Sequence, residues 1–408
     1  MPLSKIHHPK INLANPLPKD ARLPKALLYS SAAAYGGVGL ANSSLQGILP
    51  AYRQFFLGQA IGYGNHQCEV APSLIRSLRC HPVRALSFLP SDQYYGAKKR
   101  YVDWIASREL KTNNYDCFHG WSGDSESSLI VAREKDIPSM IEIPTWHRDK
   151  LKSKPFETKS DKETRIAKGW KGATGRLVVG RPRILLEYEL ADLLLVQSEA
   201  SAESFLTAGI PPERLFYVSR GVDPEKYPQA TPPDHFRLTF VGALIKRKGI
   251  HHLLQAWHKL NLKNAELVLV GHAHDEIQPF LTEFKTDSVN LTGFVPDVPS
   301  QLSQSSAFVF PSELEGTAKA TLEAASCGLP LITTREAGDA TVDGHNGIIV
   351  PPNNPDALAD AIKFLYENPD KARTMGAASR QRVLENFTWA HYHARLLHAY
   401  AHLMSYKI

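Results

Sequence analysis

The chain has 408 residues, of which 43% are hydrophobic and 22% charged, so it can form two or three globular domains with sizeable cores. Its net charge of +6 suits an anionic ligand or an anionic membrane surface, but is too mild to indicate nucleic-acid binding. Cys68, Cys80, Cys117 and Cys327 form no C-x-x-C pair, which predicts free thiols, a reducing compartment and no structural zinc.

Residues 1–24 are polar and punctuated by prolines, and we expect a flexible leader rather than a secretory signal. No stretch of about 18 consecutive apolar residues occurs, so no membrane span is predicted. A cytoplasmic protein is expected, with peripheral contact at the inner face of a membrane as an option.

Residues 25–223 alternate short apolar runs with helix-like stretches, which predicts a first α/β domain closed by a proline-rich hinge at 224–234. We expect strands at 25–30, 83–89, 115–119, 137–143, 192–196 and 214–218, and helices at 40–49, 98–110, 124–135, 178–190 and after 198.

Glycines follow the first of these strands, at positions where a backbone can approach a phosphate or a sugar closely. Gly37 and Gly39 are therefore candidate donor-binding residues. Asn42 stands where the dinucleotide fingerprint needs Gly or Ala, and no acidic residue follows about 20 positions later, which argues against a nicotinamide cofactor. A tight turn without a ligand is the alternative.

His119 ends the strand predicted at 115–119, at the edge of the sheet where α/β ligand sites form. It is therefore a candidate catalytic residue, and a hydrogen-bonded histidine at the end of a strand is the alternative. Further along, the most basic stretch of the chain covers residues 147–176. It is interpreted either as a solvated loop or as a site for an anionic acceptor or anionic lipid headgroups.

The βα alternation continues through a second predicted domain at 235–387. We expect strands at 237–241, 266–270, 289–295, 307–310, 329–333 and 347–350, and helices at 249–260, 275–284, 317–327, 356–367 and 371–386. Such alternation with short connections predicts parallel sheets covered on both faces, and hence two Rossmann-like domains.

The second domain carries charged side chains where its strands end. Glu315 lies in a polar turn with Gly316, and Glu323 lies within the helix that follows. The free N–H groups at the start of that helix favour an anion, and carboxylates accept hydrogen bonds from sugar hydroxyls. Arg247 and Lys248 follow another strand and suit a diphosphate. These residues together predict a site for a sugar joined to a phosphate.

The E-x₇-E spacing of Glu315 and Glu323, followed by A-x-x-C-G-L-P, resembles the retaining family-4 glycosyltransferases of the GT-B fold. The segments 240–249 (FVGALIKRKG) and 343–347 (DGHNG) strengthen the resemblance, which covers residues 236–387. It implies two Rossmann-like domains that face across a cleft. The first binds the acceptor and the second a nucleotide-sugar, and a last helix at 389–404 packs back on the first domain.

The resemblance also implies the reaction, which is transfer of a hexosyl group from a nucleoside-diphosphate sugar to a sugar or lipid-linked acceptor. Retention of configuration and a role in polysaccharide or glycolipid assembly follow from the resemblance alone. Because cations stabilise the departing diphosphate, no metal and no cofactor are expected.

The resemblance assigns one role to each motif. Glu323 holds the ribose, and the backbone at Phe294 and Val295 contacts the base. Glu315 and the N–H groups of the next turn face the hexose and the distal phosphate; these N–H groups belong to Gly316, Thr317 and Ala318.

The sequence departs from the family at two positions. Ala243 stands where an arginine often follows the glycine, and Trp121 replaces the second histidine of a His-x-His pattern. A non-catalytic nucleotide-sugar-binding regulator or scaffold is therefore the alternative function. A glycosidase with paired carboxylates is disfavoured, because both glutamates lie in one βα unit and would not flank a bond.

Overall fold

The computed structural model describes residues 2–14, 17, 21–34, 57–63, 75–77, 82–148 and 179–406. The chain forms two compact units. The first comprises residues 1–196, 204–218 and 393–408, and the second comprises 197–203 and 219–392. The predictions at Gly37, Gly39, the helix at 40–49 and all but the first two residues of the basic stretch 147–176 lie outside the described residues.

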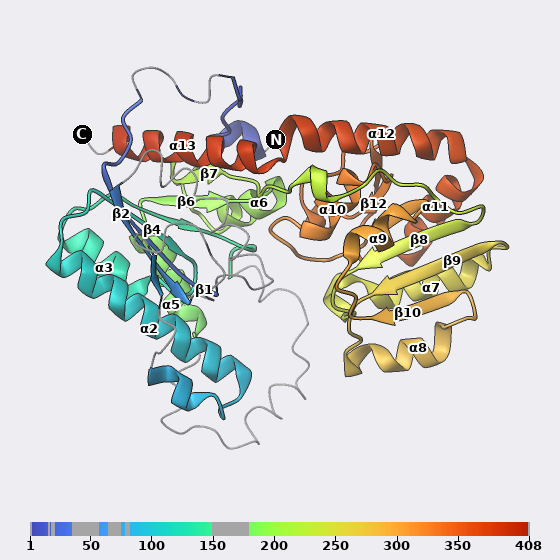
Figure 1. The fold of residues 1–408 in the computed structure, drawn as a ribbon, viewed down its shortest axis with the longest axis horizontal. Helices are drawn as coiled ribbons and strands as arrows, with labels where there is room; N and C mark the ends of the chain where they lie inside the picture. The colour runs from blue at the N-terminus through green and yellow to red at the C-terminus, as the bar shows by residue number, and fades with distance from the viewer. Residues whose placement is uncertain are drawn as a thin grey trace. The chain divides into compact units, whose positions relative to one another are not determined.

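The first unit contains a parallel sheet of seven strands in the order β3-β2-β1-β4-β5-β6-β7. Figure 1 labels β1, β2, β4, β6 and β7 of this sheet. Leu27 and Leu28 of β1 pair with Gly58 and Gln59 of β2 on one side, and with Cys117 and Phe118 of β4 on the other. The strands are β1 (Ala26–Ala34), β2 (Leu57–Tyr63), β3 (Ile75–Ser77), β4 (Cys117–Trp121), β5 (Ser139–Glu142), β6 (Leu193–Val196) and β7 (Leu215–Tyr217).

Helices connect these strands. The described helices that begin in this unit are α2 (Ser91–Thr112), α3 (Glu126–Glu134) and α5 (Arg181–Leu190), and α2 packs against α3. Helix α6 (Glu199–Thr207) begins in the second unit and ends in the first, as does α13 (Trp389–Tyr406).

The second unit contains a parallel sheet of six strands in the order β10-β9-β8-β11-β12-β13. In chain order this is the 3-2-1-4-5-6 arrangement of a doubly wound Rossmann sheet. The strands are β8 (Phe236–Val241), β9 (Ala265–Val270), β10 (Val289–Gly293), β11 (Ala307–Phe310), β12 (Leu331–Thr333) and β13 (Gly347–Ile349). The helices are α7 (Ile250–Leu260), α8 (Gln278–Phe284), α9 (Val298–Ser303), α10 (Lys319–Ser326), α11 (Pro355–Glu367) and α12 (Pro369–Asn386).

Buried apolar strands and helix faces form the core of the second unit. All four residues of β11 are buried, and Phe310 stacks on Phe240 of β8 with ring centroids 5.3 Å apart. From β8 the chain moves to its neighbour β9 on one side, and from β11 it moves to β12 on the other side. Both crossovers are expected to be right-handed, so the connecting helices α7 and α10 lie on opposite faces of the sheet. Helix α11 packs against α7, and α12 packs against α10. The prediction of an α/β fold with two parallel sheets is confirmed.

Two local predictions are wrong, and three elements were not predicted. Residues 83–89 were expected to form a strand, but Pro82–Leu86 forms a 3₁₀ turn, as a proline at its start permits. The strands β2 and β3 and the helix α9 were not predicted. The strand at 115–119 runs on to Trp121, because Gly120 is not a turn glycine. A Cβ there would lie 2.2 Å from Oγ of Ser125, so the glycine permits a close contact instead.

Within the described residues, no helix combines the length and the apolar character needed to cross a bilayer.

Candidate functional site

The second sheet reverses its winding between β8 and β11, which are hydrogen-bonded neighbours. In open α/β sheets, ligands bind outside the carboxyl ends of the strands at such a switch point. Two loops leave the sheet here, residues 242–249 after β8 and residues 311–318 after β11. Both carry the charged residues that the sequence singled out.

Arg247, Lys248 and Glu315 form one charged cluster on these loops. Nη1 of Arg247 lies 2.9 Å from Oε1 of Glu315, and Nζ of Lys248 lies 3.6 Å from the same oxygen. Arg247 also donates a hydrogen bond to the carbonyl of Leu314. Two cations against one carboxylate leave the cluster with a net charge of about +1, so it can attract an anion.

The side chain of Lys248 is largely shielded from solvent. It is 17% exposed, and its Nζ lies 4.7 Å from the centre of the Phe310 ring. Burial lowers the pKa of Lys248, while the Glu315 carboxylate opposes this change. A partly desolvated ammonium interacts more strongly with a phosphate than an exposed one does, because less water screens the pair.

Two glycines bring the loops this close. Gly249 has a φ of +72°, and a Cβ there would lie 2.2 Å from the carbonyl oxygen of Pro311. Gly242 has a φ of +152°, and a Cβ there would lie 3.2 Å from Nζ of Lys248. A larger residue at position 249 would push the two loops apart.

The turn that precedes α10 differs from the prediction. The helix begins at Lys319 rather than Thr317, and the N–H of Ala318 donates to the carbonyl of Ala337 at 2.9 Å. That group is therefore occupied, which corrects the expectation that it is a free donor. Among the described residues, the N–H groups of Gly316 and Thr317 have no hydrogen-bond acceptor. These two remain available to an anion.

Glu323 belongs to a separate polar group. Its side chain is 6% exposed, its Oε1 pairs with Nζ of Lys319, and the hydroxyl of Tyr227 donates to the same oxygen. Burial and the Glu323 carboxylate raise the pKa of Tyr227, so its hydroxyl stays protonated and keeps donating. The structure therefore brings Arg247, Lys248 and Glu315 together, whereas Glu323 has different contacts.

Phe294 and Val295 follow β10, which is the edge strand of the sheet. The ring of Phe294 is 77% exposed, and Val295 is half-buried. Gly293 adopts a φ of +68°, and its carbonyl accepts the N–H of Gly271 at 2.8 Å. The carboxyl ends of β9 and β10 are thus joined here, and the backbone that follows is accessible.

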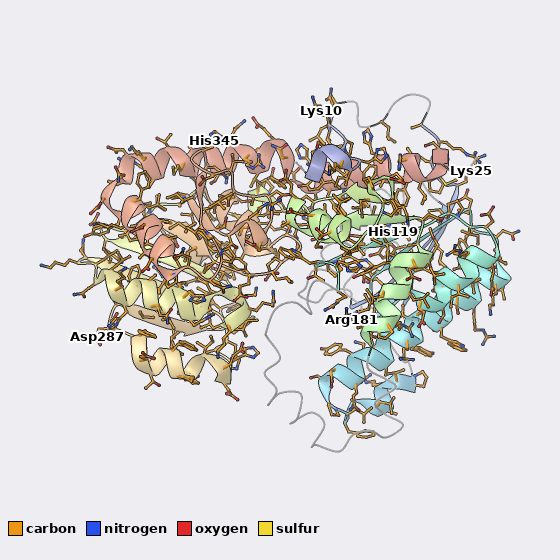
Figure 2. All side chains as sticks on the ribbon, turned by 180° about the vertical axis from the view of Figure 1, so that it is seen from behind. Lys10, Lys25, His119, Arg181, Asp287 and His345 are labelled. Carbon is orange, nitrogen blue, oxygen red and sulfur yellow. The ribbon has the colours of Figure 1, made fainter. Side chains whose placement is uncertain are left out.

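His119, labelled in Figure 2, lies inside β4 rather than at its end. It is completely buried in the first unit. Its Nδ1 is 2.7 Å from the hydroxyl of Tyr400, and its Nε2 is 3.4 Å from Glu142. The edge of its ring faces Tyr29. Trp121 is also buried, and its indole N–H donates to the hydroxyl of Tyr29 at 2.6 Å. Both side chains are enclosed by protein groups.

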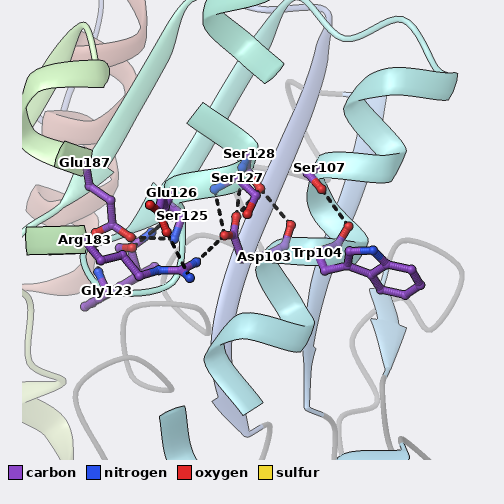
Figure 3. Close-up of polar contacts among 11 residues, drawn as sticks. Asp103, Trp104, Ser107, Gly123, Ser125, Glu126, Ser127, Ser128, Arg183 and Glu187 are labelled. Atoms are coloured by element: carbon purple, nitrogen blue, oxygen red, sulfur yellow. Dashed lines mark hydrogen bonds and ion pairs between the residues drawn. The ribbon is translucent and has the colours of Figure 1, made fainter. Parts of the chain in front are cut away.

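A buried carboxylate at the start of α3 was not predicted from the sequence (Figure 3). Asp103 of α2 is fully buried and accepts hydrogen bonds from the N–H groups of Ser127 and Ser128 at 2.8 and 2.9 Å. Nη2 of Arg183, from α5, lies 2.5 Å from the same carboxylate. The residues come from three helices, so no local pattern could indicate the contact.

A second buried carboxylate occupies the same turn. Glu187 accepts hydrogen bonds from the N–H groups of Gly123 at 2.5 Å and Ser125 at 2.9 Å. Burial raises the pKa of Glu187 to about 8, and the two backbone donors oppose this rise. Burial also raises the pKa of the adjacent Asp124, to about 6. The N–H groups of Gly123 and Ser125 in this turn are therefore occupied by a side chain of the chain itself.

The segment that contains Arg247, Lys248 and Glu315 is similar to a known protein family. Residues 235–368 match the family described as Glycosyl transferases group 1. The chain is 28% identical over 246 residues to an alpha-maltose-1-phosphate synthase of Mycolicibacterium smegmatis, covering 52% of this chain and 63% of that protein. It is 31% identical over 163 residues to the capsular polysaccharide biosynthesis glycosyltransferase CapM of Staphylococcus aureus, covering 38% and 43%. The matches thus span less than two thirds of each relative.

Solved structures with the same fold cover nearly the whole chain. Sucrose-phosphate synthase from Thermosynechococcus elongatus matches with a TM-score of 0.69 at 18% identity, covering 94% of this chain and 100% of that one. HepE of Anabaena, crystallised in complex with UDP-glucose, matches with a TM-score of 0.63 at 18% identity, with the same coverage. At this identity the likeness shows the fold, and it confirms the predicted fold class.

Proposed function

We propose that this chain, whose residues 235–368 form a glycosyl transferases group 1 domain, is a glycosyltransferase that moves a hexosyl group from a nucleoside-diphosphate sugar to an acceptor hydroxyl. The observation that carries the proposal is the cluster of Arg247, Lys248 and Glu315 at the switch point of the second sheet. The crystallised complexes of HepE with UDP and UDP-glucose support the choice of donor class.

In the proposed reaction, the bond between the anomeric carbon and the β-phosphate oxygen breaks, and its electron pair stays on the diphosphate. The acceptor oxygen forms the new bond to the anomeric carbon, and its proton passes to the departing diphosphate. Negative charge therefore grows on the leaving group. Lys248 and Arg247 stabilise this charge, together with the free N–H groups of Gly316 and Thr317, because they are already in place before the reaction.

Glu315 has a positioning role in this scheme. By pairing with both cations it holds their side chains, and it leaves other donors of the guanidinium and ammonium groups for a phosphate. Glu323 is proposed to bind the ribose, with Tyr227 and Lys319 holding its carboxylate in one orientation. The family relationship suggests that the sugar is transferred with retention, in polysaccharide or glycolipid assembly.

The experiment for this proposal is incubation of the full chain with UDP-, GDP- and ADP-sugars and measurement of nucleoside diphosphate release. A thermal-shift screen selects the base first, since a ligand at about 100 times its Kd adds about 2.7 kcal/mol of stability. The proposal predicts that one donor both stabilises the protein and releases its nucleoside diphosphate, faster when an acceptor is added. If no donor shifts the melting temperature and none is cleaved, the proposal is wrong.

A second candidate is a regulator that binds nucleotide-sugars without transferring the sugar. It is favoured by Ala243, which places no charge after Gly242, and by the occupied N–H of Ala318, which removes one donor from the site. Such a protein would show a thermal shift with a nucleotide-sugar but no release of nucleoside diphosphate, even over long incubations.

A further inference from the structure

Two histidines and one glutamate come together beside the charged cluster. His251 and His252 lie in the first turn of α7, and Glu313 lies in the loop that follows β11. One ligand atom from each of the three lies within 4.8 Å of the other two. No other group of this kind, with at least three potential ligands, occurs among the residues that the structure describes.

We propose that His251, His252 and Glu313 bind a divalent transition-metal ion of the zinc type. Two imidazole nitrogens and one carboxylate oxygen are a ligand set that zinc commonly takes, whereas magnesium and calcium prefer oxygen ligands alone. Three protein ligands leave the fourth position of a tetrahedral ion to water. The site goes beyond the proposed sugar transfer, which uses no metal.

The surroundings of the three residues favour a metal over an exposed cluster that forms by chance, because Glu313 is buried and the two histidines are half-buried. Glu313 is only 1% exposed, and a bound cation would stabilise a carboxylate that is buried to this extent. Nδ1 of His251 is buried and has no hydrogen-bond partner among the described residues. The rings of His251 and His252 have centroids 3.8 Å apart, so both reach the same small volume.

One neighbouring charge works against the ion. Lys246 precedes the histidines, and its Nζ lies 5.2 Å from the centre of the Phe280 ring, which also contacts His251. Its positive charge repels a divalent cation. The single carboxylate of Glu313 offsets part of this repulsion, so we expect micromolar rather than picomolar affinity for Zn²⁺.

The ion would join two loops that already touch. The N–H of Glu313 donates to the carbonyl of Arg247 at 2.9 Å, and the hydroxyl of Ser312 lies 3.3 Å from the same oxygen. Coordination would fix the first turn of α7 against the loop that carries Glu315. The metal is therefore structural in this proposal: it holds the backbone of Arg247 and does not take part in bond breaking.

The test is a calorimetric titration of the chelator-treated full chain with ZnCl₂ at pH 7.5, without any nucleotide. We expect one bound ion per chain, and a loss of affinity of at least about tenfold in His252→Gln and in Glu313→Gln. His272→Gln is the matched control, because His272 faces His274 in the same unit outside the cluster, and it should bind as the wild type does. Failure of the wild type to bind one ion overturns the proposal, as does unchanged binding in both cluster variants.

Cobalt provides a second readout that does not depend on the folding of any variant. Co²⁺ added to the wild type should give the visible absorption of a tetrahedral site with nitrogen and oxygen ligands, and Zn²⁺ should displace it. An intense thiolate charge-transfer band would assign the ion to cysteine, and a weak octahedral spectrum would indicate solvent-like binding. Either spectrum contradicts the proposal. Because no donor sugar is present, neither experiment depends on glycosyltransferase activity.

Discussion

The turn after β4 in the first unit and the turn after β11 in the second occupy the same place in their sheets. The first turn follows β4, which pairs with β1, and the second follows β11, which pairs with β8. In both sheets the order of the strands reverses direction at this pair. Each turn also leads into a helix, α3 or α10. The framework therefore offers two equivalent anion sites.

The two turns use their backbone donors in opposite ways. In the first unit, the carboxyl groups of Asp103 and Glu187 accept the N–H groups of the turn, so these backbone donors are already occupied. In the second unit, the N–H groups of Gly316 and Thr317 have no acceptor among the described residues, and Lys248 lies close by. A filled turn stabilises the fold, whereas an open turn lined by cations can bind a ligand.

The largest expected effect concerns the filled turn. Asp103→Ala removes the acceptor of two backbone N–H groups and leaves the half-buried Arg183 without that partner. We expect the first unit to lose about 3–5 kcal/mol of stability. Calorimetric unfolding measures this loss, with Asp92→Ala as the control because Asp92 is an exposed acid on the same helix.

Asp103→Ala should not change ligand binding by the second unit. Binding of a nucleoside diphosphate should keep its wild-type affinity at temperatures where both units are folded. A variant as stable as the wild type would show that the carboxylate is not needed to fill the turn.

The next effect concerns the open turn. Lys248→Met keeps most of the side-chain volume but removes the charge, and turnover should fall by one to three orders of magnitude, about 1.5–4 kcal/mol. Steady-state release of nucleoside diphosphate measures the change. Lys246→Met is the matched control in the same short turn and should retain activity. Unchanged turnover in Lys248→Met would remove the phosphate assignment.

A smaller effect is expected at Glu323. Glu323→Gln should weaken donor binding by about 1–2 kcal/mol without a matching loss of turnover at saturating donor, because in the proposed complex the residue contacts the ribose and not the departing phosphates. Tyr227→Phe is the companion variant, because it removes the hydroxyl that donates to Glu323 but leaves the carboxylate free to bind the ribose. Equal losses of affinity in the two variants would mean that Glu323 acts by holding the structure around Tyr227.

The last prediction concerns a dependence of stability on pH. The carboxyl of Glu187 has a pKa of about 8 when folded, against an ordinary value of 4.5, because it is buried. Between these values the folded state keeps a proton that the unfolded state releases, so the free energy of unfolding of the first unit falls as the pH rises from about 4.5 to 8. Denaturant titrations should give a flatter profile for Glu187→Gln. An equally steep profile would assign the proton to another group.

The sequence predicts regular elements well where apolar runs are unbroken. The strand at 307–310 is confirmed, and residues 235–368, which carry Glu315 and Glu323, match a Glycosyl transferases group 1 domain. Errors arise where a residue has a tertiary role. Gly120 permits a contact with Ser125 instead of ending a strand, and the hydrogen bond from Ala318 delays the start of α10.

The candidate site was predicted only in part, for a physical reason. Arg247 and Glu315 are 68 positions apart, and only the pairing of β8 with β11 brings them to 2.9 Å. The carboxylates of Asp103 and Glu187 gave no signal, because each contacts a turn from a different helix. The assignments of His119, Gly37 and Gly39 remain predictions.

We propose above all that the second unit binds a diphosphate through the side chains of Lys248 and Arg247. This proposal is tested most directly by comparing the Kd of a nucleoside diphosphate with that of its nucleoside, for the wild type and for the double variant Arg247→Met with Lys248→Met. We expect the diphosphate to strengthen wild-type binding by at least about tenfold, and the double variant to lose this gain while it still binds the nucleoside. A double variant that keeps the full gain from the diphosphate would contradict the account.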